Sequence, residues 1–362
     1  EVKYADLFAG RKEELEAIIK EITRLGAINP IAPMVAIVGE RRVGKTSLLV
    51  RIEKDCNKLN VLASRIALSN TTASDSWEFW REVFDKIVIT ARDIGAIAAP
   101  YDSGHFGFHR NELSESETGR MYRDRIKFPN FYLNRSPLNL PVPPSHLIQE
   151  DLVLLLEAIN AKGYKGILLM LDEAHLLKES YQITQQLRHA VHAVINLGVI
   201  FAGEPQLGQM FTNPSQPLFA QANVTPLQNF VSIKDVAECA LLPISYEERK
   251  FMNPMTVDYL ARLSQGKPNQ IRLICYSIYN RFLNNEQKDL NITIDVLEDV
   301  IDNIAASYTE YDLRMQVDSI RRLNSVDLES LYNMTRYPNW SIDDVINLDE
   351  SFRGGQKVNH QR

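Results

Sequence analysis

Residues 34–50 read MVAIVGERRVGKTSLLV, and the expected architecture follows from this stretch. Its first part, 34–38, is apolar at every position, which is typical of a central strand buried on both faces of a parallel sheet. Its last part spaces apolar residues at helical intervals. Between them lies the pattern G-x-x-x-x-G-K-[ST], whose backbone N–H groups turn toward an anion at the start of a helix. We therefore expect residues 39–46 to cradle phosphates.

The residues of this loop have distinct expected roles. Lys45 is expected to reach the β- and γ-phosphates of a nucleotide, and the Thr46 hydroxyl to ligate Mg²⁺. The backbone and side chains that we expect to contact the nucleotide are those of Gly39, Glu40, Arg41, Arg42, Val43, Gly44, Lys45, Thr46 and Ser47.

A second apolar run, 167–171, ends in Asp172 and Glu173. A carboxylate at this place holds the Mg²⁺ shell, which is the role expected of Asp172, and Mg²⁺ is therefore a predicted metal with Thr46 and Asp172 as its ligands. Glu173 is expected to orient and polarise the attacking water. His175 follows, and it is either a local hydrogen-bonding residue or a coupling residue. Together the two motifs predict an ATPase that uses ATP and Mg²⁺, with Lys45 and Glu173 as catalytic residues.

The rest of the chain predicts an α/β fold. Apolar runs and helical patterns alternate, which indicates a parallel sheet with helices on both faces. The predicted strands are 34–38, 61–68, 166–171 and 198–203, and the later helices are 254–264, 268–285 and 293–306. We expect a P-loop α/β core over 1–235 with an insertion at 95–146, and a helical lid over 236–308. A small C-terminal helical segment, 309–362, is either plain helices or the start of a winged helix.

The composition of the chain indicates which broad class of protein it belongs to. The chain has 362 residues, of which 45% are hydrophobic and 24% charged, so a sizeable core is expected. The formal net charge of −6 argues against a protein coated in nucleic acid. Three widely spaced cysteines in apolar helical patterns indicate core thiols in a reducing compartment. No apolar run has the length of a membrane span, so a cytoplasmic protein without a membrane partner is expected.

Several motifs resemble one known class. The opening FAGR at residues 8–11, followed by a helix rich in Glu and Leu, resembles the F-x-G-R-x-x-E-L motif of AAA+ and STAND ATPases related to origin-recognition proteins. The loop at 39–49 is similar to the STAND form of the P-loop. LPISYEE at 242–248 and SQGKPN at 264–269 resemble the lid of that family. The match covers residues 6–305 without the insertion.

The resemblance implies further site residues. The nucleotide is expected between the α/β core and the lid, with Arg11 and the Phe8 segment near its adenine end. Arg272, on the helix after the G-x-P turn, is the candidate for the family's sensor-2 arginine.

Two departures from the family affect hydrolysis. Glu204 follows the fourth strand, where the family's sensor 1 is usually Asn, Ser or Thr. No arginine occurs from His189 to Glu248, the interval in which ring-forming members place a finger that acts on a neighbour. Either the finger comes from elsewhere, with Arg188 and the insertion as candidates, or hydrolysis is slow and works as a timer. The ATPase is thus expected to be slow or stimulated by a partner.

Two functions follow from these observations. The first is an ATP-operated switch that changes shape or self-assembles on ATP and controls a protein effector, by analogy in anti-invader defence. The second is a DNA-acting AAA+ regulator, such as an origin-recognition, helicase-loading or transposition-targeting ATPase. Nucleic acid would then bind at residues 120–135, where basic and aromatic residues interleave, or at the C-terminal segment. A scaffold with an inactive P-loop is the third interpretation.

Overall fold

The computed structural model describes residues 8–27, 32–95, 142–242, 252–284 and 292–307. Several predictions fall outside these ranges. They are most of the insertion, with its basic and aromatic stretch at 120–135, nearly all of the LPISYEE motif at 242–248 and the C-terminal segment 309–362.

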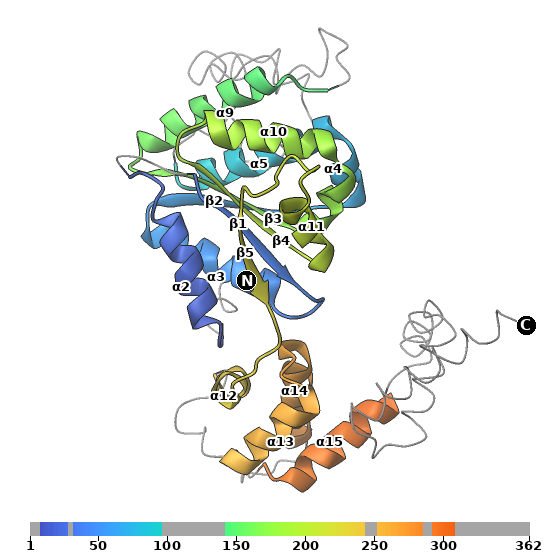
Figure 1. The fold of residues 1–362 in the computed structure, drawn as a ribbon. Helices are drawn as coiled ribbons and strands as arrows, with labels where there is room; N and C mark the ends of the chain where they lie inside the picture. Colours follow the sequence, from blue (N-terminus) through green and yellow to red (C-terminus); the bar gives the residue numbers. More distant parts are fainter. Residues whose placement is uncertain (1–7, 28–31, 96–141, 243–251, 285–291, 308–362) are drawn as a thin grey trace, which may run out of the picture. The chain divides into compact units, whose positions relative to one another are not determined.

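A five-stranded sheet forms the centre of the fold (Figure 1). Its strands are β1 (Met34–Gly39), β2 (Val61–Ala67), β3 (Gly166–Asp172), β4 (Leu197–Gly203) and β5 (Asn223–Leu227). They are all parallel and lie in the order β2-β3-β4-β1-β5. The four predicted strands are thus confirmed. β5 was missed because this edge strand is short, largely exposed and interrupted by Pro226, so it has no apolar run.

Helices cover both faces of the sheet. On one face lie α2 (Lys12–Ile22) and α3 (Lys45–Lys58), and on the other α5 (Ser76–Asp93), α9 (Ser145–Asn160) and α10 (Tyr181–Ala193). Successive strand residues point to opposite faces. In β3, for example, Leu168 packs with the α2 and α3 side and Leu169 with the α5, α9 and α10 side. The prediction of a parallel α/β core with helices on both faces is confirmed.

Short helical turns connect these elements. α4 (Asn70–Ser74) precedes α5, the 3-10 helix η1 (Ala174–Glu179) precedes α10, and η2 (Pro205–Gly208) and α11 (Gln209–Thr212) follow β4. The chain turns at Ser180, between η1 and the start of α10.

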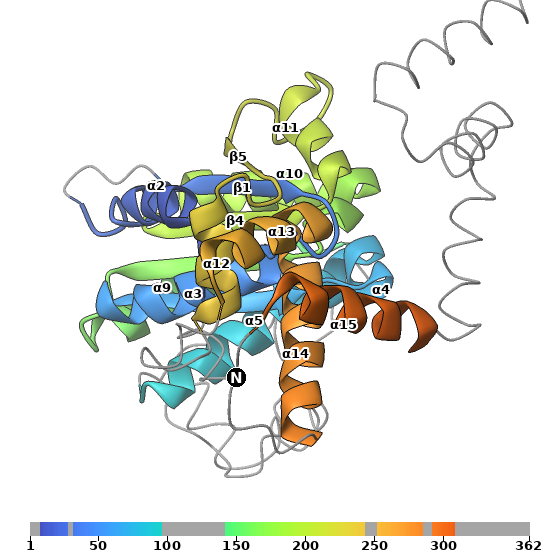
Figure 2. The same ribbon diagram turned by 90° about the horizontal axis from the view of Figure 1, so that it is seen from below.

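Three helices follow the sheet, namely α12 (Ile233–Leu241), α13 (Pro254–Ser264) and α14 (Pro268–Asn284). Figure 2 shows them from below. Local sequence explains where α13 starts and stops. Asn253 caps it by accepting a hydrogen bond from the Thr256 backbone at 2.9 Å, and Pro254 occupies its first turn. It ends where Gln265 and Gly266 both take positive φ angles.

The glycine at that turn also contacts the segment that follows β5. The Phe230 amide donates to the Gly266 carbonyl at 2.8 Å. A Cβ atom on Gly266 would lie 2.0 Å from the Phe230 carbonyl oxygen, so no larger residue fits without movement.

The chain divides into two compact units, Glu1–Ile294 and Asp295–Arg362. The described part of the second is 295–307, which is α15 (Ile294–Ser307) without its first residue. The finer division into core, lid and C-terminal segment stays a prediction. Within the described residues, no helix is both long and apolar enough to cross a membrane.

Candidate nucleotide-binding site

The phosphate loop joins β1 to α3, at the edge where the parallel strands end. Two glycines shape it for different reasons. Gly44 has a φ of 104°, which favours glycine, and a Cβ on Gly39 would lie 2.4 Å from the Leu227 carbonyl of β5. The first glycine of the motif is therefore required by the neighbouring strand, and the second by the turn into the helix.

Lys45 lies within this loop and is only 7% exposed. Its Nζ donates to the carbonyl oxygens of Gly39 at 2.8 Å and Glu40 at 2.7 Å. Burial lowers the pKa of this amine, and the nearby carboxylates, Glu173 foremost, act in the opposite direction. The ammonium is thus held by two neutral acceptors, and stronger charged acceptors such as phosphate oxygens can replace them.

Thr46 and Asp172 meet although 126 residues separate them. The Thr46 Oγ1 donates to Asp172 Oδ2 at 2.7 Å, and Asp172 is 4% exposed. A hydroxyl and a carboxylate are the oxygen donors that Mg²⁺ prefers. The donor set therefore fits the predicted metal.

A cavity of about 520 Å³ opens beside the loop, within the size range of ligand pockets. Glu173 lines this cavity, and so do residues of the phosphate loop and of the start of α3 (Arg41, Arg42, Val43, Gly44, Lys45, Thr46 and Ser47). The other lining residues come from the N-terminal segment, from the chain between β5 and α12, and from α12 and α14 (Phe8, Ala9, Arg11, Phe230, Cys239, Pro268, Asn269 and Arg272). Of the predicted nucleotide and metal residues, Gly39, Glu40 and Asp172 are not among those lining it.

Arg11 is buried and donates hydrogen bonds to two backbone carbonyls. Its guanidinium donates to the Val43 carbonyl at 3.4 Å and to the Gln228 carbonyl, and its charge lies 4.7 Å from the centre of the Phe230 ring. These contacts tie the N-terminal segment to the phosphate loop and to the end of β5. Its predicted role in nucleotide binding stays a prediction.

Arg272 lies on α14 beside the Cys239 thiol of α12. Burial raises the pKa of Cys239, while the charge of Arg272 and its hydrogen bond to the thiol oppose that shift. The three cysteines are free thiols; Cys56 and Cys239 are buried, as expected, and Cys275 is only partly buried.

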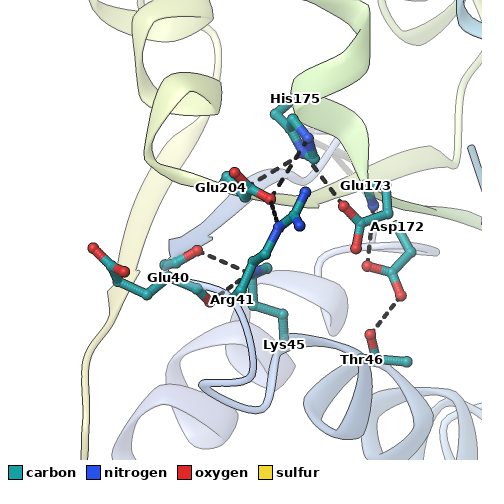
Figure 3. Close-up of polar contacts among 9 residues, drawn as sticks. Glu40, Arg41, Lys45, Thr46, Asp172, Glu173, His175 and Glu204 are labelled. Carbon is teal, nitrogen blue, oxygen red and sulfur yellow. Dashed lines mark hydrogen bonds and ion pairs between the residues drawn. The ribbon is translucent and has the colours of Figure 1, made fainter. Parts of the chain in front are cut away.

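Glu173 follows β3 in the left-handed region, with a φ of 57°, and its side chain is 47% exposed. Its carboxylate Oε2 lies 3.5 Å from His175 Nδ1. Beyond the histidine, Glu204 forms an ion pair with Arg41 of the phosphate loop (Figure 3). Glu204 is thus paired with Arg41, one of the two loop arginines that line the cavity.

Sequence reasoning missed several residues of the cavity. Phe230 and Cys239 are separated from the phosphate loop by nearly 200 residues and belong to no recognised motif, so only folding shows their proximity. Glu204 was singled out as an unusual residue after the fourth strand, but its partner Arg41 was not foreseen.

Comparisons with known proteins give the following. No protein-family model and no curated protein matches the chain. Among solved structures, it is similar to Drosophila ORC bound to DNA, with 12% identity and a TM-score of 0.47, over 97% of this chain and 75% of that one. It is also similar to the Aeropyrum pernix ORC1 protein in complex with DNA, with 11% identity and a TM-score of 0.42, over 96% and 78%.

Proposed function

We propose that this chain binds ATP with Mg²⁺ and hydrolyses it. The observation that carries the proposal is the 2.7 Å hydrogen bond between Thr46 and Asp172, with Lys45, the residue before Thr46, held by the carbonyls of the same loop. A hydroxyl at the start of the helix and a carboxylate at the end of β3 are the pair that a Mg-nucleotide requires.

Each residue has a distinct task in this proposal. Lys45 exchanges its carbonyl partners for phosphate oxygens and neutralises their charge. Thr46 and Asp172 hold Mg²⁺, which supplies charge neutralisation of the phosphates when bound. Glu173 accepts a hydrogen bond from the attacking water and orients it toward the γ-phosphate. Its half-exposed side chain lies on the cavity, which gives it the access that this task needs.

Binding of a fluorescent ATP analogue tests the proposal. We expect Lys45→Ala to abolish binding, because the phosphates lose the cation of the motif. Lys58→Ala is the matched control, since Lys58 lies exposed at the other end of the same helix. Equal affinity of the two variants would refute the assignment of the phosphate loop.

The downstream role stays a prediction in both of its forms, the ATP-operated switch and the DNA-acting regulator. The surfaces that would separate them, at 120–135 and in the C-terminal segment, lie outside the described residues. ATPase rate measured alone, with duplex DNA and with RNA separates the two, because only the regulator should be stimulated by nucleic acid.

A further inference from the structure

The guanidinium of Arg41 is held by only one of its three nitrogens. Its Nε donates a hydrogen bond to Glu204 Oε1 at the end of β4. A guanidinium has five N–H donors, so four remain on the two Nη nitrogens, and none of these four is bonded within the part of the chain that the structure describes. The Arg41 side chain is 81% exposed and lines the cavity. The phosphate loop therefore offers the cavity a charged group with four available donors.

Glu204 is a firm support for this arginine. Its side chain is only 18% exposed, and its backbone N–H donates to His175 Nδ1 at 3.5 Å. A Cβ on the preceding Gly203 would lie 2.8 Å from the His175 backbone nitrogen, so the end of β4 packs closely on the turn after β3. The hydrogen bond from Arg41 is the main cause that lowers the pKa of Glu204, which keeps the carboxylate charged. A carboxylate cannot donate to a phosphate, but through Arg41 the end of β4 presents donors.

The position of Arg41 in the loop brings its side chain near the expected γ-phosphate. Lys45 Nζ donates to the Glu40 carbonyl at 2.7 Å, and this carbonyl belongs to the peptide group that leads into Arg41. In Figure 3 the guanidinium of Arg41 lies between the carboxylates of Glu204 and Glu173. Glu204, through its hydrogen bond, and Glu173, through its charge, both raise the pKa of Arg41. Since Glu173 is proposed to orient water toward the γ-phosphorus, Arg41 lies close to the place where hydrolysis would occur.

The other arginine of the loop lacks this support. Arg42 also lines the cavity, but among the described residues its side chain has no ion pair and no hydrogen bond. Its backbone is in the left-handed region, with a φ of 63°. Of the two loop arginines, Arg41 is therefore the one whose direction is set by a carboxylate.

We propose that Arg41 is a catalytic residue that donates from its Nη groups to the γ-phosphate, and that Glu204 positions it. In hydrolysis the water oxygen bonds to the γ-phosphorus while the bond from this phosphorus to the bridging oxygen breaks. ADP leaves with the electron pair, and the proton that the water loses passes to solvent. A guanidinium directed at the γ-phosphoryl oxygens stabilises the charge that develops during this step. Arg41 thus supplies, from within the chain, the arginine that the interval from His189 to Glu248 lacks. The inference rests on the proposed ATPase function.

Binding of nucleotides with and without a γ-phosphate tests the contact. With Mg²⁺, we expect Arg41→Ala to weaken binding of a slowly hydrolysed ATP analogue by about 10–100-fold, the effect of losing a hydrogen bond to a charged group. Its affinity for ADP should stay near the wild-type value, which also shows that the variant is folded. Arg262→Ala removes an ion-paired arginine of α13 that is 76% exposed, and this control should change neither affinity.

Two outcomes of the binding experiment would overturn the proposal. Equal losses of affinity for the ATP analogue and for ADP in Arg41→Ala, or no loss for either, would show that Arg41 does not contact the γ-phosphate, and the ATPase proposal would stand. Wild-type protein that binds neither nucleotide would overturn both proposals.

Turnover separates catalysis from binding. At saturating ATP, kcat of Arg41→Ala should fall about 10²–10³-fold, the effect of removing one donor from a site of developing charge. Glu204→Ala should lower kcat in the wild-type protein, because Arg41 loses its direction, but should cause no further decrease in Arg41→Ala. An unchanged kcat in Arg41→Ala would refute the catalytic role, and a further decrease in the double variant would refute positioning by Glu204.

Discussion

Asp151 provides the sharpest test of how this fold depends on pH. It lies on α9, is 0% exposed, and neither carboxyl oxygen has a hydrogen-bond partner among the described residues. Burial, aided by the charge of Glu150, raises the pKa of Asp151 from the ordinary 3.8 to about 8. At neutral pH the folded protein therefore keeps this group protonated, whereas the unfolded chain ionises it.

The sign and size of the effect follow from linkage. Because the pKa of Asp151 is raised in the folded protein, the contribution of this group to stability is most favourable below about pH 4. That contribution is lost as the pH rises toward about 8. Between the unfolded pKa of 3.8 and pH 7 there are about 3 units, each worth about 1.36 kcal/mol, so Asp151 lowers the free energy of unfolding by about 4 kcal/mol at pH 7. Replacing it by the neutral isostere in Asp151→Asn should recover about that amount.

Urea unfolding of both proteins at several pH values is the assay. The difference in unfolding free energy should be near zero at pH 4 and grow steadily to pH 8, because the other titrating groups are common to both proteins. Glu157→Gln, an exposed carboxylate on the same helix, is the control and should show little change. A pH-independent difference between wild type and Asp151→Asn would refute the assignment of a raised pKa.

Three further outcomes are expected. Glu173→Gln should bind the ATP analogue normally and hydrolyse ATP about 10²–10⁴-fold more slowly, and unchanged steady-state turnover would show that another group activates water. Gln186→Leu should lower the unfolding free energy by about 2–4 kcal/mol, because it leaves buried donors and acceptors without partners, whereas the neighbouring, exposed Gln185→Leu should not. The third variant replaces Arg120, Arg123 and Arg125 of the insertion with alanine. If the insertion binds nucleic acid, a plot of log affinity for DNA or RNA against log salt concentration should lose roughly one unit of slope for each lost phosphate contact. An unchanged slope would favour the ATP-operated switch.

The residues that bind Gln186 show why such networks escape sequence reasoning. Its amide oxygen accepts from Ser76 at 2.6 Å and from Trp80 Nε1 at 2.9 Å, and its nitrogen donates to the Pro143 carbonyl at 2.7 Å. These partners come from α5 and from the segment before α9. A glutamine in a helix gives no sign of such partners, because they depend on which helices share a face of the sheet.

The sequence by itself determined the local elements of this protein. The apolar run at 34–38, the glycine pattern of the phosphate loop and the helical spacing at 254–264 predicted structures that the fold contains, because each depends on neighbours a few residues away. The same holds for Asp172 and Glu173, whose position follows from the end of a buried strand. Strand 223–227 was missed, since an edge strand that needs no apolar run has no local signature.

Tertiary structure alone decided which of these elements meet. β4 lies between β1 and β3, and this order brings Glu204 to Arg41 across 163 residues of sequence, with His175 beside them. The tertiary structure also brings Gly39 against Leu227 and Gly266 against Phe230. At both glycines there is no room for a Cβ atom. Such contacts depend on strand order and helix packing, which arise from the burial of the whole core rather than from any one stretch of residues.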